Sequence, residues 1–519
     1  MRTRSRCENE GLCHYRDEAG VIAQILSPPS AIQQPSPNGF FFCRLSWHHR
    51  DMPSELYKSF LKRNPSPQQR FESGKSVRKK VPRSSIGQYT VEANRQSPID
   101  ILLSQAKTRI PEYVPIRHAR MAVDPFAFFR GGAAIMAKDL ATTPSPPITV
   151  QLCGDMHVSN FGFFSTTEHQ LVFGINDFDE TLPGNFDWDL KRLTASAMIA
   201  SQQLGQDKAY GEMIVRNIAQ AYRLYLHRYS ALPFIDLKRT YIDEQALTNR
   251  AKNYANEPSQ KYLKKLLDKA RKNNSLGLIG KLTETTPDGI RLIDNPPFIE
   301  HLDLSVHGND ISILNDEGMN SYIQSLPADR KHLLLNYKWI DWARKVVGVG
   351  SVGTSCWVMY FEGRDINDPL FLQSKQAQES VLASFFPKTQ FGSEGERVVH
   401  GQCLIQGAPD LFLGYGKSSE LDFYIRQLRD MKGGISIGGD GINKKVFPDF
   451  AKLFGWALAN AHSRSGDPAV LAGYCGKGEA MDDALVSFAT IYAKQNETDY
   501  DMFMKAIKSG QVSCAKKGF

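Results

Sequence analysis

The chain of 519 residues has 63 basic and 55 acidic residues, a formal net charge of +8, and 41% hydrophobic residues. This composition is that of ordinary globular proteins and excludes a fibrous or wholly disordered chain, while the length predicts more than one hydrophobic core. Because charges of both signs are interspersed, the basic excess is mild, and it suits an anionic small ligand as well as nucleic acid. No segment is apolar for the length that a bilayer requires, so we expect no membrane span.

Residues 1–74 are rich in Pro, Ser, Gln and Arg and show little periodicity, so we expect a poorly ordered N-terminal extension. The basic N-terminus lacks the apolar stretch of a secretory signal. The eight cysteines form no paired framework, as in proteins of a reducing compartment. These observations favour a cytoplasmic location.

Residues 75–345 are predicted to form a larger, mainly helical lobe. Apolar residues recur at helical spacing from Pro125, and a strand, ITVQLCGD, is expected after a run of prolines. The segment DWDLKRLTASAMIASQQLG is predicted to be a helix that begins with acidic residues, which helix N-termini favour. The segment ADRKHLLLNYKWIDWARK, residues 328–345, is predicted to be a long helix.

The pattern changes at residue 346. The runs VVGVGSVGTSCWVMYFEG, PLFLQSKQA, ERVVHGQCLIQ and LDFYIRQLRD are β-like, and one short helix, QAQESVLASFF, is expected between the second and the third. We therefore predict a small β lobe over residues 346–432. Residues 433–519 contain a Gly-rich break and helical segments, which we expect to pack on the larger lobe.

A glycine pattern, G-x-G-x-x-G, begins at Gly348; it is weak evidence by itself and is also compatible with a structural loop. The residues after it are β-branched and aromatic, whereas a dinucleotide-binding fold requires a helix there. A glycine-rich loop between two strands is typical of the cover over the phosphates in kinases. The predicted phosphate contacts come from Gly348, Gly350, Ser351 and Gly353.

Lys375 ends the next apolar run, PLFLQSK, and a lysine in an apolar strand is costly unless it meets an anion. We therefore expect Lys375 to contact the phosphates and to act in catalysis. The helix predicted after this strand offers Glu379 as the ion-pair partner of the lysine.

The stretches GDMHVSN, residues 154–160, and NDFDE, residues 176–180, place polar side chains at the ends of two strands that a hairpin is expected to join. Convergence of these ends would bring like charges together, which requires a cation. The alternative is that Asp and Asn cap turns here, as they often do. His157 is expected to brace the loop rather than to act as a base.

Phosphoryl transfer requires a carboxylate that orients the attacking hydroxyl, together with oxygen ligands for magnesium. Asp155 fits the first role. Asn160 follows it at the D-x-x-x-x-N spacing, and Asp177 and Asp179 supply carboxylate oxygens, so we predict these three residues as metal ligands.

Six motifs resemble those of an uncharacterised bacterial family, domain of unknown function 2252. They are FAFFRGGAAIMAKDL, LCGDMHVSNFG, INDFDETLPG, DWDLKRL, ARKVVGVGSVGT and FYIRQLRDMKG. The resemblance covers most of the chain from about Lys75 onward and implies no particular reaction.

More distantly, CGDMHVSN followed by INDFD is similar to the catalytic and metal-binding loops of aminoglycoside-phosphotransferase-like and choline-kinase-like enzymes, with the pattern H-G-D-x-H-x-x-N and then I-D-F/W. This likeness implies a two-lobed, protein-kinase-like α+β fold, with Asp155 as the catalytic Asp and Asn160 and Asp177 as metal ligands. Cys153 stands where those enzymes usually have His. The glycine loop and Lys375 follow the catalytic loop instead of preceding it, which a circular permutation would explain.

On this interpretation Gln427, Leu428 and Arg429 form the hinge against which adenine packs, and Arg130 either faces the cleft or pairs with a carboxylate. The sequence therefore predicts a phosphotransferase that depends on ATP and Mg²⁺ and acts on a small-molecule acceptor. A metal-dependent phosphoesterase and a catalytically silent nucleotide-binding protein are the alternatives.

Overall fold

The computed structural model describes residues 60–516 apart from 288, 303–313, 347, 349–351, 390 and 419–420. The chain divides into two units, Met1–Asn64 and Pro65–Phe519, and the fold below is that of the second. Of the predicted N-terminal extension, residues 1–59 lie outside the described residues, whereas residues 67–74 belong to a helix. Gly350 and Ser351 of the predicted phosphate loop also lie outside the described residues.

The second unit is a mixed α+β fold with antiparallel sheets. The helices are α2 (Pro67–Val77), α3 (Pro98–Ala106), α4 (Val114–Met121), α5 (Pro125–Gly131), α6 (Ala133–Leu140), α7 (Asp187–Gln203), α8 (Lys208–Tyr229), α9 (Phe234–Arg239), α10 (Glu244–Tyr254), α11 (Glu257–Arg271), α12 (Leu276–Leu282), α13 (Asp316–Ser325), α14 (Ala328–Leu334), α15 (Glu394–Gln406), α16 (Phe447–Ser465), α17 (Pro468–Cys475) and α18 (Ala480–Lys508). The strands are β1 (Thr149–Leu152), β2 (Phe161–Ser165), β3 (Leu171–Ile175), β4 (Leu182–Asn185), β5 (Thr283–Thr286), β6 (Gly289–Leu292), β7 (Ile299–Glu300), β8 (Lys338–Lys345), β9 (Cys356–Glu362), β10 (Pro369–Gln376), β11 (Gly414–Lys417), β12 (Asp422–Gln427) and β13 (Gly433–Gly434).

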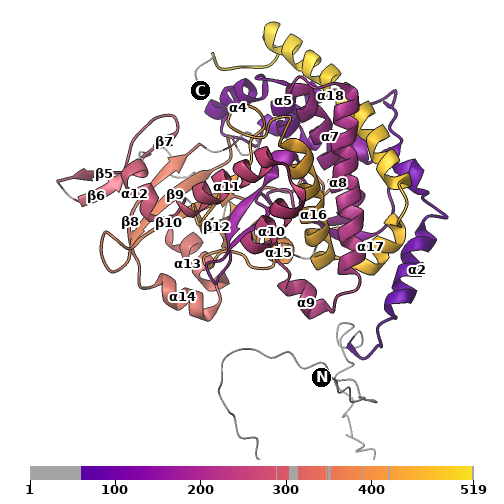
Figure 1. Cartoon of the computed structure of the whole chain (residues 1–519). Coiled ribbons are helices and arrows are strands. Elements are labelled where there is room, and N and C mark those ends of the chain that lie inside the picture. Colours follow the sequence, from indigo (N-terminus) through magenta and orange to yellow (C-terminus); the bar gives the residue numbers. More distant parts are fainter. Residues whose placement is uncertain are drawn as a thin grey trace, which may run out of the picture. The chain divides into compact units, whose positions relative to one another are not determined.

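The largest sheet has six strands in the order β11-β12-β10-β9-β8-β7. Strands β8, β9 and β10 follow one another in the chain and in the sheet, whereas α15 and β11 separate β10 from its other neighbour, β12. Figure 1 shows β8, β9, β10 and β12 grouped to one side of the long helices α7, α8 and α16. Apolar clusters cover both faces of this sheet, one around Trp357 and Leu372 and the other around Val358 and Phe371.

The helical part is built on α7, α8, α16, α17 and α18, which pack on one another around the main hydrophobic core. α7 begins at Asp187, as the acidic start of its sequence predicts. Helices α8 and α16 approach closely, because a Cβ atom on Gly455 would lie only 2.2 Å from the main-chain oxygen of Ile218. A bilayer-spanning helix is absent from the described part of the chain, where each helix is too short or too polar.

The prediction of one long helix over residues 328–345 is wrong in its second half. Helix α14 ends at Leu334, and the rest of the segment is strand β8, so the sheet begins before residue 346. A β-bulge between Trp339 and Asp341 interrupts the alternation of side chains, and Trp339 and Trp342 consequently pack on the same hydrophobic cluster. Their spacing of three residues imitates one face of a helix.

Two further predictions are wrong between β10 and β11. Residues 376–386, predicted as a helix, contain no helix, and the β-like run at 396–406 lies inside α15. The Ser393 side chain caps α15 by accepting a hydrogen bond from the Glu396 main-chain nitrogen. Consecutive valines in this run suggested a strand, but Val398 and Ile405 are buried seven residues apart, at a helical period.

Candidate functional site

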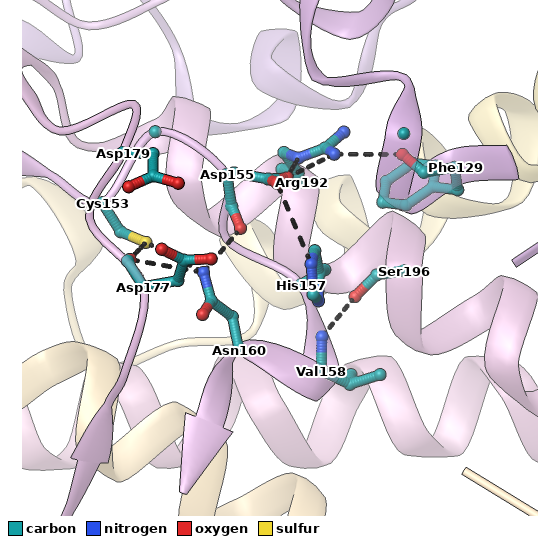
Figure 2. A network of polar contacts seen from close by, with 12 residues as sticks. Phe129, Cys153, Asp155, His157, Val158, Asn160, Asp177, Asp179, Arg192 and Ser196 are labelled. Carbon is teal, nitrogen blue, oxygen red and sulfur yellow. Dashed lines mark hydrogen bonds and ion pairs between the residues drawn. The ribbon is translucent and has the colours of Figure 1, made fainter. Parts of the chain in front are cut away.

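The two acidic stretches meet at one end of the β2–β3 hairpin. Phe161, the first residue of β2, pairs with Ile175, the last residue of β3. The loop predicted to be catalytic, residues 153–160 and called the catalytic loop below, therefore enters the hairpin at the end where a second loop leaves it. This second loop, residues 176–181, is predicted to bind a metal and is called the metal loop below. Figure 2 shows Asp155, Asn160 and Asp177 side by side, as the expected convergence of strand ends requires.

Asn160 joins the two loops through its amide nitrogen. This nitrogen donates hydrogen bonds to the main-chain oxygens of Asp155, at 3.0 Å, and Asp177, at 3.4 Å. The thiol of Cys153 donates to the same Asp177 oxygen at 3.2 Å. Both residues therefore fix the spacing between the loops in this structure.

Helix α7 contacts the catalytic loop through three polar side chains on one face of the helix. The carboxylate of Asp189 accepts hydrogen bonds from the main-chain nitrogens of Cys153, at 2.7 Å, and Gly154, at 2.9 Å. Arg192 binds the Asp155 carboxylate, with its Nε 2.7 Å from Oδ1, and Ser196 accepts a hydrogen bond from the loop at 3.1 Å (Figure 2). Residues spaced by three and four positions share a helix face, so the sequence of α7 encodes this support.

His157 lies beside Asp155 but is neutral. Its Nε2 is 3.9 Å from Asp155 Oδ2, and its ring packs edge-on against Phe126. Burial lowers the pKa of His157 to about 3, and the nearby carboxylate of Asp155 compensates only in part. A histidine with this pKa is unprotonated at neutral pH and is a weak base, which fits the expected bracing role.

Lys375 reaches the metal loop from strand β10. Its Nζ lies 3.1 Å from Asp179 Oδ2 and 3.8 Å from Asp177 Oδ1, although 196 residues separate it from Asp179. Tyr424 pairs with Lys375 across β10 and β12, and its hydroxyl donates to Asp179 Oδ1 at 2.5 Å. Cross-strand partners project from the same face of a sheet, so the sheet delivers both groups to one carboxylate.

The charges at this contact balance one another. Burial acts to raise the pKa of Asp179, but Lys375 and the Tyr424 hydroxyl together hold that pKa below its ordinary value. Burial likewise opposes the charge on Lys375, yet Asp177 and Asp179 keep its pKa well above the ordinary value. Lys375 and Asp179 are therefore both ionised at neutral pH.

The partner expected for Lys375, Glu379, does not pair with it. Glu379 is exposed and lies in a segment without helix, and Asp179 takes the place assigned to it. Helix α15 contributes an arginine instead: Arg397 donates to the main-chain oxygens of Asp179, at 3.0 Å, and Thr181, at 2.6 Å. Helix α15 thus fixes the backbone of the metal loop through Arg397.

The donor set fits a hard divalent cation. The side chains of Asp155, Asp177 and Asp179 keep 22, 46 and 32% of their surface exposed, so a hydrated ion can reach them. Mg²⁺ is commonly held by one or two carboxylates, waters and substrate phosphates. Among the described residues, no group of three or more His, Cys, Asp or Glu that could hold a metal ion is present. Asp177 and Asp179 offer carboxylate oxygens, whereas the amide nitrogen of Asn160 is bonded to main-chain oxygens of the loops.

The glycine loop ends beside this site. The Gly353 main-chain oxygen accepts a hydrogen bond from Ile110 at 2.7 Å, and the Val352 oxygen accepts one from Arg109 at 2.5 Å. Arg109 lines a cavity together with Asp155 and Asp177, so this end of the loop borders the carboxylates. Gly348, at the other end, is exposed.

The predicted hinge residues, Gln427 and Leu428, already have partners for their main-chain N–H groups. Leu428 donates to the Phe371 oxygen at 2.9 Å, and Gln427 donates to the Asp410 carboxylate at 3.5 Å. The side chain of Leu428 packs on the apolar cluster that contains Phe371. These contacts join the end of β12 to β10.

Sequence reasoning missed the residues that hold the two loops in place. They are Asp189, Arg192, Arg397 and Tyr424. Asp189 and Arg192 could have been found from the sequence, because charged residues on the buried helix DWDLKRL require partners of opposite charge or hydrogen bonds. Arg397 lies in a run that was assigned to a strand, and Tyr424 is an ordinary aromatic residue of a strand, so neither carried a signal.

The family model of domain of unknown function 2252, described as an uncharacterised protein conserved in bacteria, matches residues 109–506. This match spans most of the chain and includes both loops, the glycine loop and Lys375, so the protein belongs to this family. No curated protein and no solved structure matches the chain.

Proposed function

We propose that the protein is an ATP- and Mg²⁺-dependent phosphotransferase that acts on a small-molecule acceptor. The observation that carries the proposal is the contact of Lys375 Nζ with Asp179, at 3.1 Å, and Asp177, at 3.8 Å. A buried lysine beside two carboxylates that remain accessible is the arrangement that binds a nucleotide phosphate and its divalent cation together.

The order of elements in the sheet supports a kinase-like small lobe. In protein kinases a glycine-rich loop covers the phosphates and the lysine lies on the third strand. Here the glycine loop joins β8 to β9, and Lys375 lies on β10, the next strand of the same sheet. Because these elements follow the catalytic loop in the sequence, the proposal includes a circular permutation. One departure is the carboxylate paired with Lys375, which comes from the metal loop.

The carboxylates of Asp177 and Asp179 would hold Mg²⁺, which neutralises phosphate charge when it is bound. Lys375 would contact the phosphates, and its ion pair with Asp179 holds the ammonium beside the metal loop. Asn160 remains a predicted ligand. In this structure its nitrogen fixes the distance between the loops that carry Asp155 and Asp177.

Asp155 is the proposed base. The acceptor hydroxyl oxygen forms a bond to the γ-phosphorus while the bond from that phosphorus to the β,γ-bridging oxygen breaks. ADP leaves with the electron pair of that bond, and the hydroxyl proton passes to the Asp155 carboxylate. Arg192 is a positioning residue in this scheme, because its bond to Oδ1 at 2.7 Å fixes the orientation of the carboxylate.

The alternative of a metal-dependent phosphoesterase lacks support in the described residues. Two-metal phosphoesterases gather several His and Asp ligands. The described part of the chain offers no group of three or more such ligands, whereas a nucleotide-bound Mg²⁺ needs only one or two carboxylates.

The test is titration calorimetry of the full chain with ATP in the presence and absence of Mg²⁺, on wild type and Asp177→Asn. We expect Mg²⁺-dependent ATP binding by wild type and its loss in the variant. Asp365→Asn is the matched control, because Asp365 lies in a turn and is 45% exposed, close to the 46% of Asp177. Equal binding by wild type and Asp177→Asn, or no binding by either, would overturn the proposal.

A further inference from the structure

Three arginines line a small cavity together with the acidic cluster. The cavity has a volume of about 50 Å³. Its acidic wall contains Asp155, Asp177, Asp179 and Glu180, and its basic wall contains Arg109, Arg117 and Arg130. The basic residues come from α4, α5 and the segment between α3 and α4, which are far in sequence from the strand that carries Lys375.

Arg117 is the most constrained of the three. Its side chain is 1% exposed, and it donates one good hydrogen bond, from Nη2 to the Gly131 oxygen at 2.9 Å. A longer contact, 3.4 Å, joins the same nitrogen to Gln105. Its Nε and Nη1 are buried and have no hydrogen-bond partner among the described residues. Burying a guanidinium with two unused donors is costly, so a missing acceptor is expected at this position.

Arg109 and Arg130 share this shortage of acceptors. The buried Nε atoms of both have no hydrogen-bond partner in the described part of the chain. None of the three arginines has a carboxylate within ion-pair distance there, since Arg192 binds Asp155 and Lys375 binds Asp179. Burial lowers the pKa of each arginine, and the charge of Arg109 lowers that of Arg117 further, while nearby carboxylates offset these effects only in part. An anion between them would relieve both the burial and the repulsion.

The dimensions suit one tetrahedral or planar oxyanion. At roughly 10–15 Å³ for each water-sized position, about 50 Å³ holds about four such positions, close to the oxygens of one phosphate group. A second cavity, of about 820 Å³, shares Gln105, Arg109 and Glu180 with the first. A ligand whose anionic end binds among the arginines would have room in this larger cavity for the rest of its atoms.

We propose that Arg109, Arg117 and Arg130 bind an oxyanion, a phosphate or a carboxylate, carried by the acceptor, so that the substrate class is an anionic hydroxyl compound. This inference rests on the proposed function, because only a phosphotransferase has an acceptor substrate. Guanidinium groups match phosphate and carboxylate oxygens in geometry. Asp155, the proposed base, lines the same small cavity, and Arg109 also lines the larger one.

The experiment measures binding of inorganic phosphate to the full chain by titration calorimetry, with thermal unfolding as a check on folding. We expect binding by wild type, and roughly 10- to 100-fold weaker binding by Arg130→Met and Arg117→Met, the loss of one charge-assisted contact. Arg239→Met is the matched control, because Arg239 is exposed on α9. Arg130 is less buried than Arg117, so Arg130→Met alone decides the result if Arg117→Met does not fold.

A parallel titration with ATP and Mg²⁺ shows whether the arginines bind a phosphate of the acceptor or a phosphate of the nucleotide. Unchanged ATP affinity in Arg130→Met supports the acceptor site. A parallel loss of ATP affinity assigns the arginines to the nucleotide and overturns the proposal, as does equal phosphate binding by all variants or none by wild type. If wild type binds phosphate through Arg130 but binds no ATP, the proposed function fails and the oxyanion site stands.

Discussion

Arg397 Nη1 lies 2.6 Å from the main-chain oxygen of Thr181, and this contact ties the helix beside the sheet to the loop that carries the two metal-site carboxylates. The same guanidinium donates to the oxygens of Asp179 and Gln378 and pairs with Glu394. One buried side chain therefore joins α15, the end of β10 and the metal loop.

Arg397→Met should destabilise the protein strongly. The substitution leaves three main-chain oxygens without their donor, one of them in a fully buried contact, and Glu394 without its cation. We therefore expect a loss of about 3 kcal/mol in the free energy of unfolding. Urea unfolding measures it. Arg364→Met is the control, because the Arg364 side chain is 80% exposed and its loss should cost under about 0.5 kcal/mol. Similar values for both variants would contradict the role given to Arg397.

Asp155 and Arg192 should behave as a coupled pair. The Arg192 side chain is 3% exposed and also donates to the Phe129 oxygen at 3.0 Å, so Asp155→Asn leaves a buried cation without its carboxylate. A double-mutant cycle with Asp155→Asn and Arg192→Met should give a coupling of about 1–3 kcal/mol in unfolding free energy. Additive losses would show that the pair does not fix the orientation of Asp155.

The parts of the site that lie close in sequence could be predicted. The loops at 154–160 and 176–180 are joined by a short hairpin, so their convergence follows from local pattern alone. The demand of Lys375 for an anion was also predictable, because burial of an ammonium is costly wherever it occurs. The identity of the partner could not be predicted, since Asp179 contacts Lys375 only because the sheet packs on the helical part.

The errors have physical causes of the same kind. Trp339 and Trp342 imitate a helix because a bulge places both on one face of β8. The run around Val398 favours a strand by composition, yet it is helical because its buried face packs against the metal loop, where a Cβ on Gly401 would meet Thr181. Tertiary contacts override local preference at these positions.

Gly154→Ala should lose more stability than its backbone conformation alone explains. Gly154 has φ +86°, and a Cβ there would lie 2.3 Å from the Glu180 main-chain oxygen. Gly205→Ala is the matched control, because φ is +69° and a Cβ would meet nothing within 4 Å. We expect a loss of about 1 kcal/mol for Gly205→Ala and about 2–4 kcal/mol for Gly154→Ala in thermal or urea unfolding. Equal losses would show that the catalytic and metal loops do not need this close approach.

His301 should make stability depend on pH in the alkaline range. Its hydrogen bond to Asp341, and then that to Asp294, raise its pKa from 6.5 to about 9. A raised pKa in the folded state stabilises fully below about 6.5 and loses that contribution as the pH rises toward about 9. The stability difference between wild type and His301→Gln should therefore shrink over this interval. The same comparison with exposed His332→Gln should stay flat, and a flat result for His301 would refute the assignment.

Lys375→Met should increase the effect of Mg²⁺ on the stability of the nucleotide-free protein. In wild type the ammonium of Lys375 offsets part of the negative charge of Asp177 and Asp179, with which it makes contacts of 3.8 and 3.1 Å. Without it the two carboxylates repel each other, and a divalent cation that binds only the folded state restores part of the lost stability. Thermal unfolding with Mg²⁺, against Na⁺ at matched ionic strength, should show a larger Mg²⁺-specific rise for Lys375→Met than for wild type. Lys208→Met, whose parent side chain is 70% exposed, should respond as wild type does. An identical response by all three proteins would mean that these carboxylates do not attract a divalent cation, and the metal assignment would then have to be given up.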